Sequence, residues 1–476
     1  MNTAAADQTW KDAMRAGQVH FQRGDLAQAA RAFSKATQLQ PARVEGWINL
    51  GSTLLNGRQF VDAEKTLKTA IALNAKLMAA HMLLGDAQRL QGNTDAALRS
   101  YRAAVGLERS PMALNKLACA LRSQRHREEA QTLYEEALRM APAFTLAQVN
   151  LATLQIERRE YAQARQHLDA LDMAAIPAAE RSEAESARLC LSEHERLRPA
   201  IEQLTDGNGL AELKTLLANL PKPLRAPDSP ALKNARSYLQ CAKGMGKQSA
   251  QGIIDLPQEW PLIEGLFMIP LANNVSQYLE LRHALDSGAE VSSELRESIN
   301  MATAIEAARD ARHEMSDPVA AEAQLRYWHA LTGIDVPDYS PGHFKYTQNW
   351  AAKNPNLKRV NPHQSSATLQ HFINEMYPKL RPGIVRAAVS FITLLDLHCF
   401  ADGNGRVLMI WLNRELEWNG LMPALFHRDI SLKGDLGKAL RIARNQGGDL
   451  APLISVIQRG QAFAGQFLAE LESAKE

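Results

Sequence analysis

The chain of 476 residues is long enough for two or three domains that each bury a hydrophobic core. Hydrophobic residues make up 46% of it and charged residues 22%, as in an ordinary folded protein, and a net charge of +2 gives no reason to expect nucleic acid as a partner. The four cysteines lie far apart and form no CxxC pair, which argues against a disulfide framework or a zinc site and favours a reducing compartment.

The N-terminal residues carry no recognisable targeting signal. Residues 1–10 are polar and rich in alanine, without the apolar stretch of a signal peptide, and no later segment approaches about 18 consecutive apolar residues. We therefore expect no membrane partner and a cytoplasmic location, while secretion by a signal-independent route stays open.

Residues 10–172 repeat with a period of 34 residues, shortened once by one residue. Each unit has a small residue at two fixed positions and a larger residue at a third: Gly17, Gly51, Gly85, Ala118 and Ala152; Ala29, Ala63, Ala97, Ala130 and Ala164; Phe33, Leu67, Tyr101, Tyr134 and Leu168. The pattern resembles the tetratricopeptide repeat and predicts about five units in a domain of residues 1–172. The resemblance implies a helical solenoid whose concave groove binds a segment of a protein partner.

Residues 173–290 predict a helical connector without an assigned function. Helical patterns over 180–204 and 209–220 precede four prolines between residues 221 and 230. The tetrapeptide Asp206-Gly207-Asn208-Gly209 lies between these two patterns. We interpret it as a turn, because Asp, Asn and Gly tolerate left-handed conformations.

Residues 291–476 form the third predicted domain. Apolar residues on one face predict a helix over 291–312, and two mostly apolar runs predict buried helices over 384–397 and 407–416. Between these two runs stands the sequence His398-Cys399-Phe400-Ala401-Asp402-Gly403-Asn404-Gly405-Arg406.

This nine-residue stretch has the residue types that phosphate chemistry requires. A neutral imidazole can take a proton from an attacking hydroxyl near pH 7. A carboxylate can hold a Mg²⁺ that bridges phosphate oxygens. Glycines let backbone N–H groups approach an anion at a helix N-terminus, and an arginine adds a forked charge.

The stretch resembles the signature of the Fic family, H-x-F-x-D-G-N-G-R-x-x-R, whose members transfer a phosphate-containing group, most often AMP from ATP, to protein hydroxyls. The resemblance implies His398 as general base, Asp402 as the Mg²⁺ ligand and Arg406 as the group that grips the leaving phosphate. It further implies that Gly403, Asn404 and Gly405 form an anion-binding nest. Asn413, on nearly the same helical face as Arg406, matches the family residue that contacts the nucleoside.

Two further segments carry weaker resemblances to the family. Residues 302–307 are similar to an inhibitory helix, with Glu306 as the inhibitory glutamate. Residues 340–348 resemble the segment that enters a β-hairpin flap over the active site, and the flap, with Lys345, Tyr346 and Thr347, would bind the target backbone by strand addition.

One position departs from the signature, because Met409 stands where the second arginine is expected. Methionine has neither charge nor hydrogen-bond donor, and Arg414 lies about 140° further round the helix. Three explanations stay open: ATP binds productively through Mg²⁺ and Arg406 alone; the donor has no γ-phosphate, as a CDP-alcohol or a nucleotide sugar does; or the site is impaired.

The sequence thus predicts an all-α protein with a small β-hairpin flap. Its function would be the transfer of AMP or another phosphate-linked group from a nucleotide donor to a Ser, Thr or Tyr hydroxyl of a protein, using Mg²⁺, with the repeats recruiting the target. The alternative is a tetratricopeptide scaffold whose Fic domain is weak or uses a donor other than ATP. The oligomeric state stays open, with a homodimer among the options.

Overall fold

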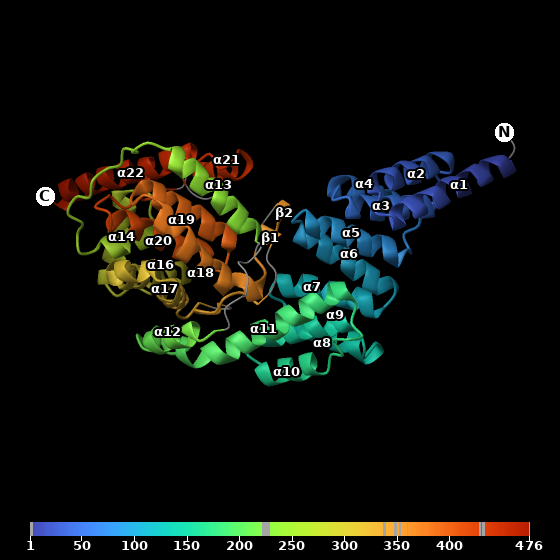
Figure 1. The fold of residues 1–476 in the computed structure, drawn as a ribbon, viewed down its shortest axis with the longest axis horizontal. Coiled ribbons are helices and arrows are strands. Elements are labelled where there is room, and N and C mark those ends of the chain that lie inside the picture. The colour runs from blue at the N-terminus through green and yellow to red at the C-terminus, as the bar shows by residue number, and fades with distance from the viewer. Residues whose placement is uncertain are drawn as a thin grey trace. The chain divides into compact units, whose positions relative to one another are not determined.

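The structure is a computed structural model that describes residues 3–220, 229–336, 339–346, 350–351, 354–358, 360–427, 430 and 434–475. The chain divides into two compact units (Figure 1). The first comprises Met1–Ala187 and Trp350–Leu357, and the second comprises Arg188–Asn349 and Lys358–Glu476.

The first unit contains ten consecutive helices that form five pairs, drawn in blue to teal in Figure 1. They are α1 (Thr3–Gln22), α2 (Leu26–Leu39), α3 (Val44–Asn56), α4 (Phe60–Leu73), α5 (Met78–Leu90), α6 (Thr94–Leu107), α7 (Pro111–Ser123), α8 (Arg127–Met140), α9 (Thr145–Glu157) and α10 (Tyr161–Asp169). The helix α11 (Ala178–Ile201) follows and spans the division between the two units.

Close packing within each pair explains the repeating small and large residues. A Cβ added to Gly51 of α3 would lie 2.6 Å from the Leu67 side chain of α4, and one added to Gly85 would lie 2.6 Å from the Tyr101 ring. The second small position is buried in all five units, at Ala29, Ala63, Ala97, Ala130 and Ala164. The two helices of a unit can therefore approach closely where one of them carries only glycine or alanine.

A left-handed residue separates the two helices of every pair, and it also follows the repeat. The residues with positive φ are Gly24, Arg58, Gly92, Arg125 and Arg159. A left-handed residue ends a helix sharply, and glycine adopts this conformation without strain. Three of the five turns use arginine instead, which is why the sequence did not reveal this periodic position.

The second unit is also helical. After a 3₁₀ turn (Leu204–Asp206) it contains α12 (Leu210–Ala218), α13 (Pro230–Gly244), α14 (Trp260–Met268), α15 (Val275–Asp286), α16 (Ser293–Ala308), a 3₁₀ helix (Arg309–Ser316) and α17 (Pro318–Thr332). It continues with 3₁₀ turns at Pro362–Gln364 and Tyr377–Lys379 on either side of α18 (Ser365–Glu375), then α19 (Ile384–Leu397), α20 (Asn404–Glu417), α21 (Asp435–Asn445) and α22 (Ala451–Lys475).

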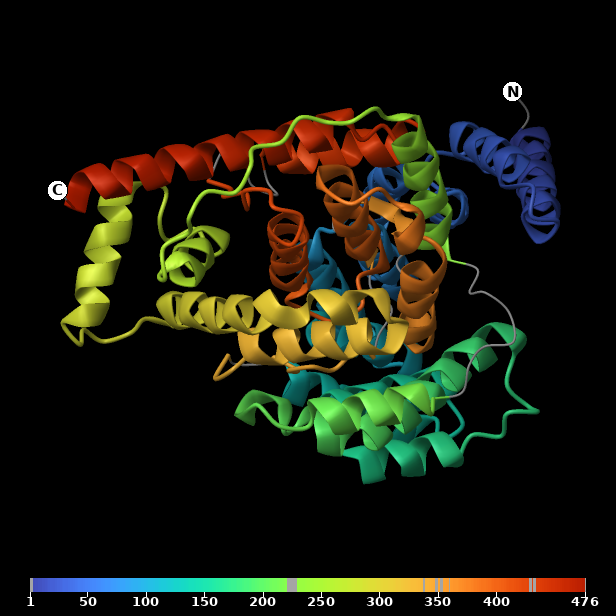
Figure 2. The ribbon, with the colours of Figure 1, turned by 60° about the vertical axis from the view of Figure 1, so that its left-hand side comes forward.

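The core of this unit surrounds α19 and α20, the two helices predicted from the apolar runs. Nearly all residues of both helices are buried, and they pack against α13, α16, α17, α18 and α22. Figure 2 shows α16 and α17, in yellow and orange, side by side, with α22 in red along the opposite side of the unit. The loop between α19 and α20 is therefore held by a rigid helical scaffold.

The predicted connector does not form a body of its own in the structure. From residue 188 onward it belongs to the second unit, and Trp260, Ile263 and Leu266 of α14 share a core with residues of α16 and α22. The predicted turn at Asp206–Gly209 is present, with left-handed Gly207 and Gly209.

The all-α prediction is confirmed, whereas the predicted β-hairpin flap over the active site is not supported. Two short strands, β1 (Trp350–Ala351) and β2 (Asn354–Lys358), pair with each other, but most of this pair belongs to the first unit. Within the described ranges, no helix combines the length and apolar character needed to cross a bilayer.

We expect that replacing Leu67 by alanine lowers the free energy of unfolding of the repeats by about 2–5 kcal/mol, because this side chain is fully buried in the contact with Gly51. The matched control is Val61→Ala on the same helix, where the side chain is 70% exposed and the change should stay within about 0.5 kcal/mol. Urea unfolding followed by circular dichroism measures both, and equal effects would contradict the packing described.

Candidate active site

The motif loop, residues 398–403, reverses the chain between α19 and α20. The helix α19 ends at His398, whose φ of 51° and ψ of 60° are left-handed, and α20 begins after Gly403, whose φ is 68°. A histidine seldom adopts this conformation, so the surrounding structure must hold it there. The six-residue loop places His398 at the end of one helix and the glycines at the start of the other.

The side chain of Asn404 closes the motif loop. Its Nδ2 donates to the carbonyl oxygen of Phe400 at 2.8 Å, and its Oδ1 accepts from the Phe400 backbone N–H at 3.0 Å. Asn404 is buried, and both functional ends of its amide are occupied by the backbone. The side chain of Asn404 thus holds the loop, while its backbone N–H, the group that an anion-binding nest would use, lies at the start of α20.

His329 of α17 binds the motif loop by a hydrogen bond and by ring stacking. Its Nδ1 accepts from the Gly342 N–H at 2.9 Å, so its Nε2 carries the proton of the neutral ring and donates to the carbonyl oxygen of Asp402 at 3.1 Å. The ring stacks on Phe400 with 3.8 Å between centroids and on Tyr339 with 4.6 Å. Burial lowers the pKa of His329 to about 3, so this imidazole is neutral at physiological pH.

Tyr339 extends the same stack toward Arg406. Its hydroxyl lies 3.0 Å from the Thr332 hydroxyl, and the Arg406 guanidinium lies 5.8 Å from the centre of its ring. Burial raises the pKa of Tyr339 to about 12, so the phenol stays neutral. A Cβ on Gly403 would overlap the Tyr339 hydroxyl, so only glycine fits there.

The 340–346 segment pairs with the motif loop along one edge. Phe344 forms an antiparallel bridge with Phe400, and the Lys345 N–H donates to the Cys399 carbonyl at 2.8 Å. Lys345 is buried and its backbone N–H is hydrogen-bonded to Cys399, so this N–H is not available for the predicted strand addition to a target. Tyr346 makes an edge contact with His194 of α11, and Thr347 lies outside the described residues.

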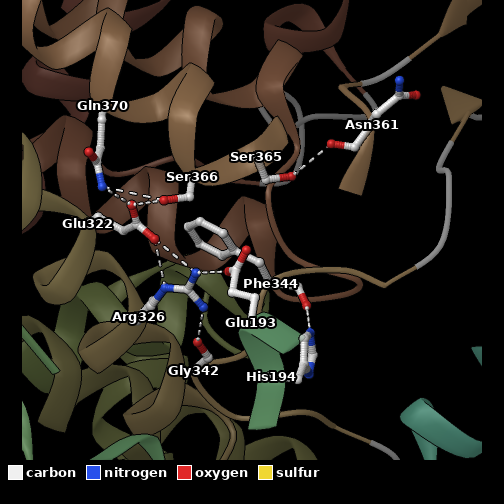
Figure 3. A network of polar contacts seen from close by, with 10 residues as sticks. All are labelled: Glu193, His194, Glu322, Arg326, Gly342, Phe344, Asn361, Ser365, Ser366 and Gln370. Carbon is white, nitrogen blue, oxygen red and sulfur yellow. Dashed lines mark hydrogen bonds and ion pairs between the residues drawn. The ribbon is translucent and has the colours of Figure 1, made fainter. Parts of the chain in front are cut away.

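A buried polar network fixes this segment (Figure 3). Arg326 of α17 donates to the Gly342 carbonyl at 3.2 Å, and its guanidinium lies 3.6 Å from the centre of the Phe344 ring. His194 contacts the Phe344 carbonyl at 3.1 Å. The charge of Arg326 is balanced by two carboxylates, Glu322 of α17 at 2.8 Å and Glu193 of α11 at 2.7 Å. Ser366 and Gln370 of α18 donate to the second oxygen of Glu322.

The motif arginine, Arg406, forms an ion pair with Glu297 of α16. Both side chains are only about a quarter exposed or less, at 24% and 20%. The predicted inhibitory residue Glu306 lies on the same helix but is 62% exposed and pairs with Arg309 at 3.1 Å. The structure thus places Glu297, and not Glu306, on the motif arginine.

Asn413, predicted to contact the nucleoside, lies inside the protein core instead. Its Nδ2 donates to Glu264 at 2.8 Å and to the Ala424 carbonyl at 3.0 Å, while its Oδ1 accepts from the Ala424 N–H at 3.0 Å. Its side chain is fully buried, so the prediction is corrected: Asn413 holds α14 and the segment after α20 against each other.

The position of the second arginine has no substitute cation from Met409, which occupies it, or from Arg414. Met409 is buried in the hydrophobic core, at 8% exposure. Arg414 is fully buried and pairs with Glu264 at 2.6 Å and with Glu417 at 3.0 Å. Burial raises the pKa of Glu264, and the neighbouring Arg414 opposes this rise. The position of the second arginine is thus an apolar core position in this chain.

Asp402 is the residue of the motif loop with the chemistry of a Mg²⁺ ligand. Its carboxylate is exposed, and its Oδ1 accepts from the Gly403 N–H at 2.7 Å, which orients it at the start of α20. Mg²⁺ commonly binds through one carboxylate while substrate phosphates and water complete its shell, so this single carboxylate fits the ion. Within the described part of the chain, no group of three or more His, Cys, Asp and Glu residues is placed to hold a metal.

The remaining motif residues differ in burial. His398 is partly buried, Gly405 is partly exposed, and Phe400 is a buried anchor of the loop. Cys399 is buried, and burial raises the pKa of its thiol to about 12, so it is no nucleophile at physiological pH.

Sequence reasoning missed His329, Tyr339 and Glu297. A single histidine or tyrosine in or after a helix is usually structural, so the first two gave no signal. Glu297 did carry one: the inhibitory helix that 302–307 resembles has a Ser or Thr four residues before its glutamate, and Ser293 stands four residues before Glu297. Glu306 lacks such a hydroxyl residue.

Comparisons with known families agree with both resemblances. The tetratricopeptide repeat profile matches residues 14–75, 48–111 and 115–180, and the profile of the Fic/DOC family matches residues 320–416. No curated protein sequence is significantly similar to the chain.

Several solved structures are similar to part of the chain. The crystal structure of MamA is 22% identical over 36% of this chain and 100% of its own, with a TM-score of 0.32. PilF of Pseudomonas aeruginosa is 18% identical over 45% and 95%, with a TM-score of 0.36. A thermophilic TPR protein of Thermus thermophilus is 20% identical over 38% and 99%, with a TM-score of 0.34.

We expect Gly403→Ala to destabilise the protein more than Gly420→Ala. Both glycines have a φ of 68°, so both alanines bear the cost of a left-handed conformation, about 1–2 kcal/mol. Nothing lies within 4 Å of a Cβ at Gly420, whereas at Gly403 the Cβ overlaps Tyr339 and should cost about 1–3 kcal/mol more. Urea unfolding of the full chain measures the difference, and equal stabilities would contradict the described contact.

Proposed function

The chain combines tetratricopeptide repeats with a Fic/DOC domain, and we propose that it is a Fic-type transferase that moves AMP or another phosphate-linked group from a nucleotide donor to a protein hydroxyl. The observation that carries this proposal is the motif loop. It has His398 at the end of α19 and the exposed Asp402 and the partly buried Arg406 next to or within the first turn of α20, on a backbone held by Asn404 and His329.

In the proposed reaction, the oxygen of a Ser, Thr or Tyr hydroxyl attacks a phosphorus atom of the donor. The new bond joins this oxygen to phosphorus, and the bond from phosphorus to the leaving phosphate oxygen breaks with its electron pair. His398 accepts the hydroxyl proton. The Arg406 guanidinium and the backbone N–H groups at the start of α20 stabilise the negative charge on the departing phosphate.

The carboxylate of Asp402 would hold Mg²⁺, which supplies charge neutralisation on the donor phosphates when bound. The neighbouring Gly403 N–H keeps this carboxylate directed by its 2.7 Å hydrogen bond. Besides the donor, the reaction needs a protein target. We propose that the groove of the repeats recruits this target and that the reaction takes place in the cytoplasm. Such a solenoid groove is suited to an extended protein segment.

The position of Met409 bears on which donors the site would accept. A buried, apolar residue at this point cannot bind a third phosphate, and loss of a charge-assisted contact costs about 1.5–3 kcal/mol, or roughly ten- to a hundredfold in affinity. ATP therefore competes as donor with molecules that lack a γ-phosphate, such as a CDP-alcohol. The alternative function, a scaffold with a weak Fic domain, receives less support because His398, Asp402 and Arg406 are all present.

We expect a donor-dependent mass increase when the full chain is incubated with Mg²⁺ and each of ATP, UTP, CTP, GTP and CDP-choline, since such enzymes modify their own hydroxyls. His398→Ala should abolish the increase, because the hydroxyl then has no base. A gain of AMP from ATP would show that Met409 is tolerated, and a gain from CDP-choline alone would show a changed donor. No increase from any donor, in the wild type and in Glu297→Gln, would contradict the proposed function.

We further propose that Glu297 restrains the enzyme. Its ion pair with Arg406 occupies the guanidinium that should bind a phosphate, so the donor must displace Glu297 before it can bind productively. A charge-assisted contact of this kind is worth about 1.5–3 kcal/mol. The resting protein would therefore have low activity.

We expect Glu297→Gln to raise the transfer rate at limiting donor by about ten- to a hundredfold, the factor that corresponds to the lost ion pair. Glu306→Gln is the matched control on α16, because Glu306 is exposed and pairs only with Arg309 among the contacts seen. Its rate should stay within about twofold of the wild type. If Glu306→Gln activates and Glu297→Gln does not, the restraint has been assigned to the wrong glutamate.

A further inference from the structure

Two residues of α17 hold both backbone groups of Gly342. Arg326 and His329 lie three residues apart and hence on one face of the helix. Arg326 donates to the Gly342 carbonyl at 3.2 Å, and the Gly342 N–H donates to Nδ1 of His329 at 2.9 Å. Gly342 itself is left-handed, with a φ of 72°, and starts the stretch that pairs with Cys399 and Phe400.

The other nitrogen of His329 reaches the motif loop. Its Nε2 donates to the carbonyl oxygen of Asp402 at 3.1 Å. An amide N–H can only donate and a carbonyl can only accept, so these two contacts admit one tautomer of a neutral ring. His329 is thereby a rigid spacer between the backbone of Gly342 and the backbone of Asp402.

Both ring faces of His329 are also in use. Phe400 covers one face at 3.8 Å between centroids with 4° between the planes, and Tyr339 covers the other at 4.6 Å and 20°. The Arg406 guanidinium lies beyond Tyr339, 5.8 Å from its ring centre. The column Phe400–His329–Tyr339–Arg406 therefore starts and ends on residues of the motif.

We propose that His329 is a positioning residue for the transfer reaction, which sets the place of Asp402 through its carbonyl and the place of Arg406 through Tyr339. This inference rests on the proposed function. His329 is only 2% exposed, so we assign it an effect through backbone geometry and not through contact with the donor or the target. A misplacement of reacting groups by about 1 Å can cost a factor of about a hundred in rate, so even a small shift of the loop should be measurable.

The test compares three variants of the full chain in the transfer assay. His329→Phe keeps a ring in the stack but removes both hydrogen bonds, and it should lower kcat about ten- to a hundredfold with a smaller change in the KM for the donor. His329→Gln keeps a donor and an acceptor at similar positions and should recover most of kcat. Tyr377→Phe is the stability control, because it removes a buried 2.6 Å hydrogen bond to Glu415 near the far end of α20.

A purely structural role would make His329→Phe resemble the control, with a lowered melting temperature and a kcat close to that of the wild type, and this result would overturn the proposal. An equal loss of kcat in His329→Gln and His329→Phe would overturn it as well, because the two hydrogen bonds would then not be what positions the loop.

A second measurement is independent of activity and separates this inference from the proposed function. In protein with ¹⁵N-labelled histidine at neutral pH, the His329 signals, assigned by their loss in His329→Gln, should report a protonated Nε2 and an unprotonated Nδ1. If no donor supports transfer in the wild type, the proposed function fails, and this tautomer still decides whether His329 links the backbones of Gly342 and Asp402 as described. The opposite tautomer or a doubly protonated ring would overturn it.

Discussion

The geometry of the candidate site depends on the closure of one short loop. Six residues reverse the chain between two buried helices, and this is possible because Asn404 bonds both backbone groups of Phe400 while His398 and Gly403 adopt left-handed conformations. A backbone turned so tightly exposes polar groups that must be satisfied from elsewhere. The scaffold supplies them through His329 and the 340–346 segment, so the residues that carry chemistry are held by residues that carry none.

The same constraint explains why one arginine has two competing uses. Arg406 begins the first turn of α20, where a phosphate would bind, and α16 passes close enough for Glu297 to pair with it. In a partly buried setting such a pair is stronger than on an open surface, because water screens it less. With Met409 at the position of the second arginine, no second guanidinium is provided there, so in the proposed function Glu297 and the donor would compete for a single group.

Much of this could be predicted from the sequence, and the limits have physical causes. Repeat periods and apolar runs identify the solenoid and the helices α19 and α20, because burial imposes regular spacing on residue types. A nine-residue motif identifies the loop, since a histidine, a carboxylate, two glycines and an arginine seldom occur together at this spacing. Asn413 and Glu306 make other contacts than those expected, because a polar side chain can serve a ligand or the protein itself, and only its neighbours in space decide. His329 and Glu297 contact the motif from other helices, and a sequence pattern on one helix does not show which residue of another helix it will contact.

The most direct test of the central claim is a thermodynamic cycle on donor binding, measured by isothermal titration calorimetry with Mg²⁺ and ATP or ADP. The account predicts that Glu297→Gln tightens binding about tenfold or more in the wild-type background and has no effect when Arg406 is replaced by alanine, because the two side chains act on each other. An equal gain in both backgrounds, or no gain in either, would contradict the claim that Glu297 and the donor compete for Arg406.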